Sequence, residues 1–402
     1  MKKEKKIKKY KQSILNYRFA QACLRLISFF IFKRKIRRNE LKKHKGPCVI
    51  IANHQCALDF ASLIGANRRP LAITISGSFY YTLSIKGVLT KMGAIPKQQF
   101  QTSVKDIKFM KTVVDEGNQL VIYPSGLMSE DGCSTPIPAT TYKFLKFLGV
   151  DVYVAKVTGT YFTMPKWAKN KRPGRTYLDI YKLFDKDELK SVEFNELKKK
   201  VDDAILFDAY KEQEELLIKY KNNDDIQGLE NVLYQCPHCK SEFSIKVKDK
   251  SLIYCENCGF EQKADKFGFL HNYKKIGEEI RHPSDWSQII YSNLKEEIVN
   301  DENYSLSAKT KFSMIDYDAR KFFEVGEGEV LLNREGFFLK GRLKNQPFYL
   351  KVPITNVASM PCKPGKYFEI QHGDDIYRCS LEDGQVCMKF VNVLEIFYQL
   401  SL

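Results

Sequence analysis

Four cysteines in two closely spaced pairs are the sequence feature that most strongly restricts the fold, and they lie within residues 229–270. The pairs are Cys-x2-Cys motifs with fifteen residues between them: Cys236 with Cys239, and Cys255 with Cys258. Thiolates at this spacing are typical of two knuckles that hold one tetrahedral Zn²⁺ ion. The sequence therefore predicts a zinc ribbon in which the metal is structural.

The alternative interpretation of these cysteines is two redox or disulfide pairs. It requires an oxidising compartment or a thioredoxin-like setting, and the sequence indicates neither. The other seven cysteines show no pairing pattern, which favours a reducing cytosol. Residues 229–270 carry six lysines and six acids, so a nucleic-acid role is not expected, whereas a protein partner is.

The length of 402 residues suggests about two to three domains. Hydrophobic residues make up 44% of the chain, which is enough for packed cores and excludes wholesale disorder. No uninterrupted run reaches the roughly 18–20 apolar residues that a spanning helix needs, so a polytopic membrane protein is not expected.

Positive charge is concentrated at the N-terminus. Residues 1–46 hold 17 Lys and Arg against two acids, which is +15 of the total +17, so the other 356 residues carry only +2. A basic block of this kind binds phosphate groups on anionic lipid or on nucleic acid, or serves as a solvated tail.

Residues 11–32 have the periodicity of an amphipathic helix. Its narrow polar stripe is expected to consist of Arg18, Gln21, Arg25 and Ser28. Spanning a bilayer would place Arg25 near the centre at a cost of roughly 2.5–3.5 kcal/mol, which an interfacial position avoids. We therefore expect residues 1–38 to bind anionic membrane lipids, with a helix packed on the protein's own core or a nucleic-acid arm as alternatives.

A histidine lies at a predicted strand-to-helix turn. Residues 47–52 form a short apolar, β-branched run that predicts a buried strand, and Asn53 and His54 follow directly before a predicted helix. Asp59, inside that helix, can fold back onto the imidazole and make His54 a general base. The alternative is an ordinary turn histidine and a surface aspartate.

Four segments occur in a characteristic order. They are NHQCALD at Asn53–Asp59, GAIPKQQ at Gly93–Gln99, YPSGLMS at Tyr123–Ser129, and a Val-rich strand over residues 150–159. Together they resemble the sequence blocks of the glycerolipid acyltransferase family, which includes the 1-acylglycerol-3-phosphate acyltransferases. The resemblance covers roughly residues 40–220, about half of the chain.

The resemblance implies an α/β domain over residues 47–221, built on a mixed sheet with flanking helices. It also implies that His54 deprotonates an acceptor hydroxyl, that Asp59 orients His54, and that the alkoxide attacks the thioester of acyl-CoA or acyl-carrier protein. The residues then expected to contact the substrates are Asn53, Gly93, Lys97, Ser125 and Gly126.

Several block residues differ from the family. Where the family usually has Arg, Glu, Thr and Arg, this chain has Gln99, Ser125, Leu127 and Met128. The Glu and the two Arg of the family are expected to contact a phosphate-bearing acceptor, so the acceptor of this chain is expected to be divergent. Lys97, as a point charge, and the backbone N–H groups of Ser125 and Gly126 are the expected substitutes. A catalytically silent lipid-binding scaffold is the alternative function.

The C-terminal part predicts a second binding module. A helical linker is expected over residues 271–321, followed over residues 322–402 by strands, hairpin turns at 333–336 and 373–375, and a helix from about 384 to 400. Strands capped by one helix are similar to pleckstrin-homology and GRAM-type domains, which bind lipids or proteins. A structural β module is the alternative.

The combined prediction is a peripheral acyltransferase at the cytoplasmic face of a membrane. It moves a fatty-acyl group from a thioester donor to a (lyso)phospholipid or glycerolipid hydroxyl group. The expected cofactor is structural zinc, a protein partner is expected at the ribbon or the C-terminal domain, and no nucleic acid is expected.

Overall fold

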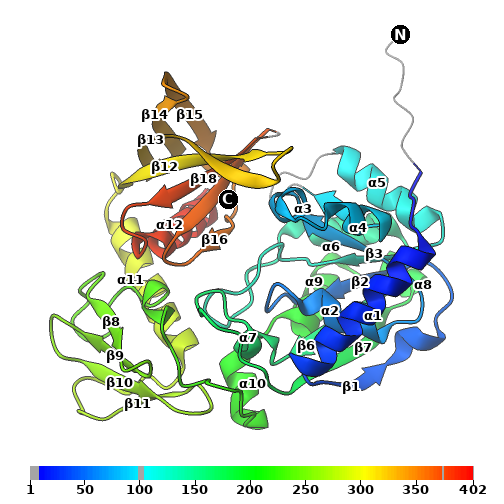
Figure 1. Cartoon of the computed structure of the whole chain (residues 1–402), viewed down its shortest axis with the longest axis horizontal. Helices are drawn as coiled ribbons and strands as arrows, with labels where there is room; N and C mark the ends of the chain where they lie inside the picture. The colour runs from blue at the N-terminus through cyan, green and yellow to red at the C-terminus, as the bar shows by residue number, and fades with distance from the viewer. Residues whose placement is uncertain (1–8, 98–103, 374, 402) are drawn as a thin grey trace. The chain divides into compact units, whose positions relative to one another are not determined.

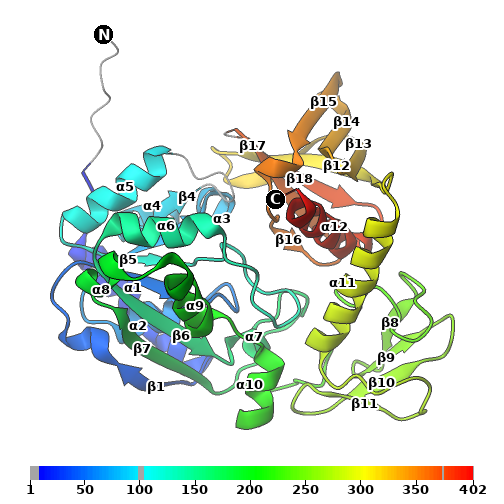
Figure 2. The ribbon, with the colours of Figure 1, turned by 180° about the vertical axis from the view of Figure 1, so that it is seen from behind.

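The computed structural model describes residues 9–97, 104–373 and 375–401, and it divides into two compact units (Figure 1, and from behind in Figure 2). Unit 1 consists of Met1–Ser129, Ser134–Thr163 and Pro173–Phe207. Unit 2 consists of Glu130–Cys133, Met164–Arg172 and Asp208–Leu402. Three segments of the expected acyltransferase domain, residues 130–133, 164–172 and 208–221, therefore belong to unit 2.

Unit 1 is built on a seven-stranded sheet of order β1-β7-β6-β2-β5-β3-β4. Its strands are β1 (Arg34–Asn39), β2 (Cys48–Ala52), β3 (Leu71–Ser76), β4 (Ile95–Lys97), β5 (Gln119–Ile122), β6 (Asp151–Thr158) and β7 (Thr176–Phe184). The strands from β6 to β4 in this order run parallel, whereas β7 is antiparallel to β6. The predicted mixed sheet is confirmed.

Helices cover both faces of this sheet, which explains why β2 is apolar and buried at every position. Val49 and Ile51 pack with α5 (Val104–Asp115), α6 (Ala139–Leu148) and α9 (Phe194–Ile205). Ile50 and Ala52 face the opposite core, where α2 (Asp59–Ala66) packs. The other helices of unit 1 are α1 (Ile14–Phe30), α3 (Gly77–Thr82), α4 (Lys86–Lys91), α7 (Thr160–Thr163), α8 (Lys186–Ser191) and the 3-10 turn η1 (Glu40–Lys43).

Helix α1 packs across α2 through polar side chains (Figure 1). Gln21 is buried, and its Nε2 donates to the carbonyl groups of Ile64 and Asn67, both at 2.7 Å. Arg25 Nε donates to the carbonyl group of Gly65 at 3.0 Å. These carbonyl groups lie in the last turn of α2 and just beyond it, where a helix cannot satisfy its own acceptors.

The opposite side of α1 exposes apolar side chains. We call the following six residues the outer face of α1: Ile14, Leu15, Phe19, Leu26, Phe29 and Phe30, with exposed fractions of 59% to 81%. A helix on a water-exposed surface normally has the reverse arrangement. The expected amphipathic helix is present, and two residues of its polar stripe, Gln21 and Arg25, cap the end of α2. No helix in the described part of the chain combines the length and apolarity needed to cross a bilayer.

Unit 2 contains two antiparallel sheets. The first, of order β11-β10-β9-β8, has strands β8 (Ile245–Lys248), β9 (Leu252–Cys255), β10 (Glu261–Ala264) and β11 (Leu270–Asn272). The second, of order β15-β14-β13-β12-β18-β17-β16, has strands β12 (Leu306–Asp316), β13 (Lys321–Asn333), β14 (Gly336–Leu343), β15 (Gln346–Pro353), β16 (Cys362–Lys363), β17 (Tyr367–His372) and β18 (Asp375–Leu381). The helical elements are α10 (Ala209–Leu216), η2 (Leu229–Asn231), α11 (Pro283–Asn300), η3 (Ile354–Asn356) and α12 (Val386–Leu400).

Helix α12 covers the second sheet of unit 2 with an aromatic contact. The Phe390 ring lies 5.1 Å from that of Phe368 and 6.5 Å from that of Phe337. The expected pattern of strands capped by a terminal helix is therefore present. Its similarity to pleckstrin-homology and GRAM-type domains stays a prediction.

The domain boundaries differ from the expected ones in two places. The first domain was expected to extend to residue 221, whereas residues from Asp208 onward belong to unit 2. Strand β12 lies in the stretch that was expected to be a helical linker, residues 271–321. Its inward positions include Ala308 and Thr310, which are too weakly apolar to produce a clear alternating pattern in the sequence.

Two partly buried carboxyl groups make the stability of unit 2 depend on pH. Burial raises the pKa of Glu395 to about 7 and that of Asp131 to about 6, although the Ser359 hydroxyl group donates to Glu395 at 2.6 Å. Because both folded-state values lie above the unfolded ones, the free energy of unfolding should fall as pH rises through about 6 to 7, with Glu395 contributing on the order of 2 kcal/mol.

The measurement is the thermal unfolding of unit 2 between pH 5 and pH 8. The matched variant is Glu395→Gln, which has no titrating proton at this position and should show a shallower decline. An unchanged slope in Glu395→Gln would contradict the expected origin of the effect.

Candidate active site

The segments expected to form the site meet at one edge of the sheet of unit 1. Parallel strands present their carboxyl ends at the same edge, where ligands of α/β proteins bind. His54 follows β2, Tyr123 follows β5, Lys97 ends β4 and Gly159 follows β6. The strand order therefore brings together four segments that are separated by as many as 105 residues (54 to 159) in the sequence.

The His54 imidazole is held by Asp59, the first residue of α2. His54 Nδ1 lies 3.1 Å from Asp59 Oδ2. The same oxygen accepts the backbone N–H groups of Gln55 at 2.6 Å and of Cys56 at 2.9 Å, while the Cys56 thiol donates to Oδ1 at 3.3 Å. Asp59 is buried and the His54 side chain is 19% exposed, so a rigid carboxylate orients an imidazole that solutes can reach.

The contact between Nδ1 and Asp59 determines which nitrogen of the His54 imidazole can accept a proton. With Nδ1 donating to Asp59, Nε2 is the nitrogen that can accept a proton. The aspartate also stabilises the imidazolium that forms. The sequence prediction that His54 and Asp59 form one unit agrees with the geometry, and the pair can act as a general base.

Tyr123 was not among the predicted site residues, although it directly follows β5. Its ring lies 4.3 Å from the His54 imidazole with 32° between the planes. Burial, with a further contribution from Asp59, raises the pKa of Tyr123 well above its usual value, so the phenol stays protonated. Its position after a strand of the same parallel set is the signal that could have identified it.

Asn53 has a structural role in place of the expected contact with substrate. It is buried, its Nδ2 donates to the Val157 carbonyl group at 2.8 Å, and its Oδ1 accepts the Val157 N–H group at 2.8 Å. Gln55 makes a second link, because its Oε1 accepts from the Thr160 hydroxyl group at 3.0 Å. Both residues tie the His54 turn to β6 and the residues that follow it.

Two glycines also differ from the expectation. Gly93 has φ +81°, and a Cβ there would lie 2.0 Å from the hydroxyl oxygen of Tyr10, so Gly93 is needed for packing. Gly126 donates its N–H to the carbonyl group of Tyr123 at 3.0 Å, so this group is not available to an anion as expected. The Ser125 hydroxyl group donates to the Leu127 carbonyl group at 3.1 Å, which stabilises the same turn.

Lys97 stays a candidate for contact with the acceptor. It ends β4 and is partly buried, and its desolvation lowers its pKa while Asp106 opposes that change. A desolvated ammonium group gains from an anion that approaches it, which is the role expected for this residue. Gln99 lies outside the described residues.

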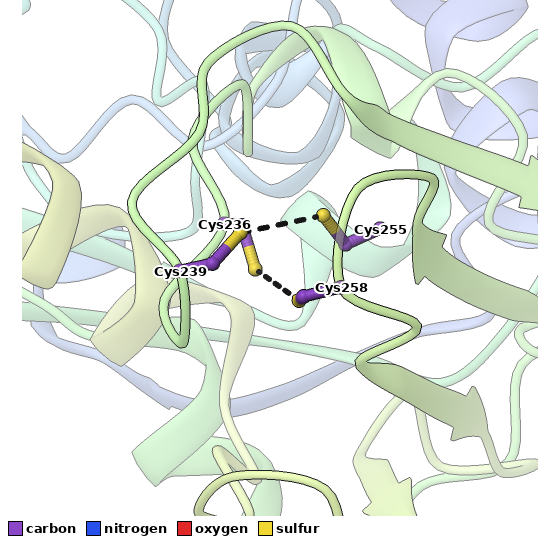
Figure 3. Close-up of side chains that lie close together, drawn as sticks. All are labelled: Cys236, Cys239, Cys255 and Cys258. Atoms are coloured by element: carbon purple, nitrogen blue, oxygen red, sulfur yellow. Dashed lines mark hydrogen bonds between the residues drawn. The ribbon is translucent and has the colours of Figure 1, made fainter.

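The four predicted metal ligands lie together in unit 2 (Figure 3). Their sulfur atoms are all within 4.8 Å of one another. The Cys236–Cys258 and Cys239–Cys255 sulfur pairs are each 3.7 Å apart, close to the about 3.8 Å that tetrahedral Zn–S bonds of about 2.3 Å require. That separation is also far longer than a disulfide bond. The cluster could therefore hold a metal ion.

Sequence comparison identifies proteins that are similar to part of the chain. Residues 33–149 match the model of the family described as Acyltransferase. A curated 1-acyl-sn-glycerol-3-phosphate acyltransferase, BAT2 (chloroplastic) of Brassica napus, is 27% identical over 121 residues. That match covers 30% of this chain and 35% of the relative, so the chain spans about a third of the length of the curated protein it matches.

Two solved structures are similar in part. The 1-acyl-sn-glycerophosphate acyltransferase PlsC of Thermotoga maritima aligns with a TM-score of 0.41 and 16% identity, over 47% of this chain and 78% of that one. The Ran-binding domain of Nup2 from Ashbya gossypii aligns with a TM-score of 0.20 and 12% identity, over 25% of this chain and 97% of that one.

Proposed function

We propose that unit 1 transfers a fatty-acyl group from an acyl thioester to the hydroxyl group of a lysophospholipid or other glycerolipid. The observation that carries this proposal is the His54–Asp59 pair at the carboxyl edge of the sheet, within the segment that matches the acyltransferase family. The donor is acyl-CoA or acyl-carrier protein.

The proposed reaction needs one base. His54 Nε2 takes the proton of the acceptor hydroxyl group as its oxygen attacks the thioester carbonyl carbon. The tetrahedral intermediate collapses with cleavage of the C–S bond, and the imidazolium returns the proton to the leaving thiolate. Asp59 keeps the imidazole in the required tautomer and orientation throughout.

The acceptor is proposed to carry an anionic group that contacts Lys97. Lys97 lies at the same sheet edge as His54 and is partly desolvated. An ammonium group binds a phosphate as a point charge and lacks the two-pronged grip of the Arg that the resembled family uses. This difference supports an acceptor other than an ordinary glycerol phosphate.

Membrane association is proposed to occur through the outer face of α1. Its six apolar side chains are largely exposed in the described part of the chain, whereas Gln21 on the polar side of the helix already binds carbonyl groups at the end of α2. Exposed cations flank the helix, among them Lys11 before it and Lys33 after it. Apolar contact together with attraction to anionic headgroups is how interfacial helices bind a cytoplasmic membrane face.

Substitutions on the outer face should release the protein from membranes. The double variant Phe19→Asp/Phe29→Asp removes two apolar side chains that are 72% and 70% exposed. The partition coefficient of the protein between vesicles and water should therefore fall roughly 10²-fold or more. The measurement is sedimentation with vesicles of phosphatidylcholine and phosphatidylserine. Point substitutions suit this test better than deletion of residues 1–38, because deletion also removes the contacts of Gln21 with α2.

The matched control is Phe147→Asp on α6, which changes another half-exposed phenylalanine of unit 1. Phe147→Asp should sediment with vesicles like the unchanged protein. Undiminished binding by Phe19→Asp/Phe29→Asp would exclude α1 as the membrane anchor.

The experiment that tests the activity is product analysis. The protein is incubated with acyl-CoA or acyl-carrier protein and with lysolipids that do or do not carry a phosphate monoester, and the lipids are identified by mass spectrometry. The expected result is a diacyl product that His54→Ala does not form. Lipid binding without product from either donor would favour the silent lipid-binding scaffold instead.

A further inference from the structure

The loop that follows β5 is shared between the two units. The chain passes from unit 1 to unit 2 between Ser129 and Glu130, and it returns between Cys133 and Ser134. A second excursion, Met164–Arg172, leaves unit 1 directly after α7. Both excursions therefore start within a few residues of segments that contact the His54 turn.

On the side of unit 1, the loop is hydrogen-bonded to the turn that carries His54. The Ser129 N–H group donates to the carbonyl group of His54 at 3.3 Å, and Ser129 is buried. Any displacement of Ser129 therefore acts on the backbone of the residue that carries the proposed base.

On the side of unit 2, the next residue is held by a buried ion pair. The Glu130 carboxylate pairs with Lys166 Nζ, and the two side chains are only 8% and 12% exposed. The Cys362 thiol also donates to Glu130 Oε1 at 3.6 Å. Burial disfavours the charge on Lys166, but Glu130 more than offsets this, so the pKa of Lys166 lies above its usual value.

We propose that the Glu130–Lys166 ion pair is a positioning element for His54, through which unit 2 controls acyl transfer. Ser129 donates to the His54 carbonyl group, and one peptide bond joins Ser129 to Glu130, which pairs with Lys166 in unit 2. Unit 2 therefore acts on the His54 turn through the chain. The part of this inference that concerns turnover rests on the proposed function, whereas the part that concerns loop order does not.

The test is the variant Lys166→Met in the full-length chain. It leaves the Glu130 carboxylate buried without its cation, which is unfavourable, so residues 124–129 should lose their order. Amide hydrogen exchange of peptides covering 124–129, read by mass spectrometry, should become at least about tenfold faster. The kcat for acyl transfer should fall roughly ten- to hundredfold with little change in the KM for the donor, because the substitution misplaces the base.

Two further variants separate positioning from general damage to unit 2. Lys166→Arg keeps a cation opposite Glu130 and should retain both loop protection and kcat. Lys389→Met breaks another buried ion pair of unit 2, in which Lys389 Nζ lies 2.6 Å from Glu242 Oε2. It should leave exchange at 124–129 unchanged at temperatures where unit 2 stays folded.

Unchanged exchange at 124–129 in Lys166→Met would overturn the proposal, whether unit 2 stays folded or not. Equal acceleration in Lys389→Met with unit 2 folded would overturn it too. If the unchanged protein transfers no acyl group, the proposed function fails, and the exchange comparison still decides whether unit 2 orders the loop.

Discussion

Replacement of His54 by alanine is expected to lower kcat/KM for acyl transfer by about 10²–10⁴-fold, the range that a general base contributes. Asp59 orients the His54 imidazole so that it can abstract a proton, and the His54 side chain is partly exposed to solutes. Alanine removes the base but leaves the backbone contact between His54 and Ser129 in place. The measurement is the initial rate with a labelled acyl thioester and a lysolipid acceptor.

The matched control is His372→Ala in β17, which removes an exposed histidine from unit 2 and should leave the rate unchanged. Asp59→Asn is a less direct test, because the Asp59 carboxylate also accepts the N–H groups of Gln55 and Cys56. Equal turnover by His54→Ala and the unchanged protein, with both folded, would end the acyltransferase proposal.

Loss of the proposed zinc ion should have the second large effect, on stability. Structural zinc supplies about 10–16 kcal/mol of apparent binding free energy in small zinc domains, and that energy is available only to the folded state. The variant Cys255→Ser removes one of four sulfur ligands that lie within 4.8 Å of one another. We expect it to lose metal and to lower the unfolding temperature of unit 2 strongly, while unit 1 unfolds as before.

Metal analysis by inductively coupled plasma mass spectrometry, together with thermal unfolding, measures both effects. Cys23→Ser is the matched control, because Cys23 is an exposed cysteine on α1. Cys23→Ser should keep one zinc per chain and the original unfolding temperature. A zinc content well below one per chain in the unchanged protein would contradict the metal assignment.

Features that depend on neighbouring residues could be predicted from the sequence. Asp59 reaches His54 because the turn between them is only four residues long, and the four cysteines meet because each pair belongs to one knuckle. Strand β2 was predictable because both of its faces are buried, so every residue in it is apolar.

The roles of Asn53, Gly93 and Gly126 could not be predicted in this way. Each has a partner that is close in space but unrelated to the motif that drew attention to the residue. Asn53 binds Val157, and Gly93 makes room for Tyr10. A motif shows which residue types are present, but it does not show which of their polar groups are already used.

For this protein, the sequence by itself determined the His54–Asp59 pair, the cysteine cluster and the amphipathic character of α1, because each arises from a residue pattern within one continuous segment of chain. Only the tertiary structure decided that the polar side of α1 caps α2, that four strand ends share one edge, and that Glu130 belongs to unit 2. The physical reason is that hydrogen bonds and ion pairs between distant segments depend on which surfaces the whole fold brings together, and no local pattern records that choice.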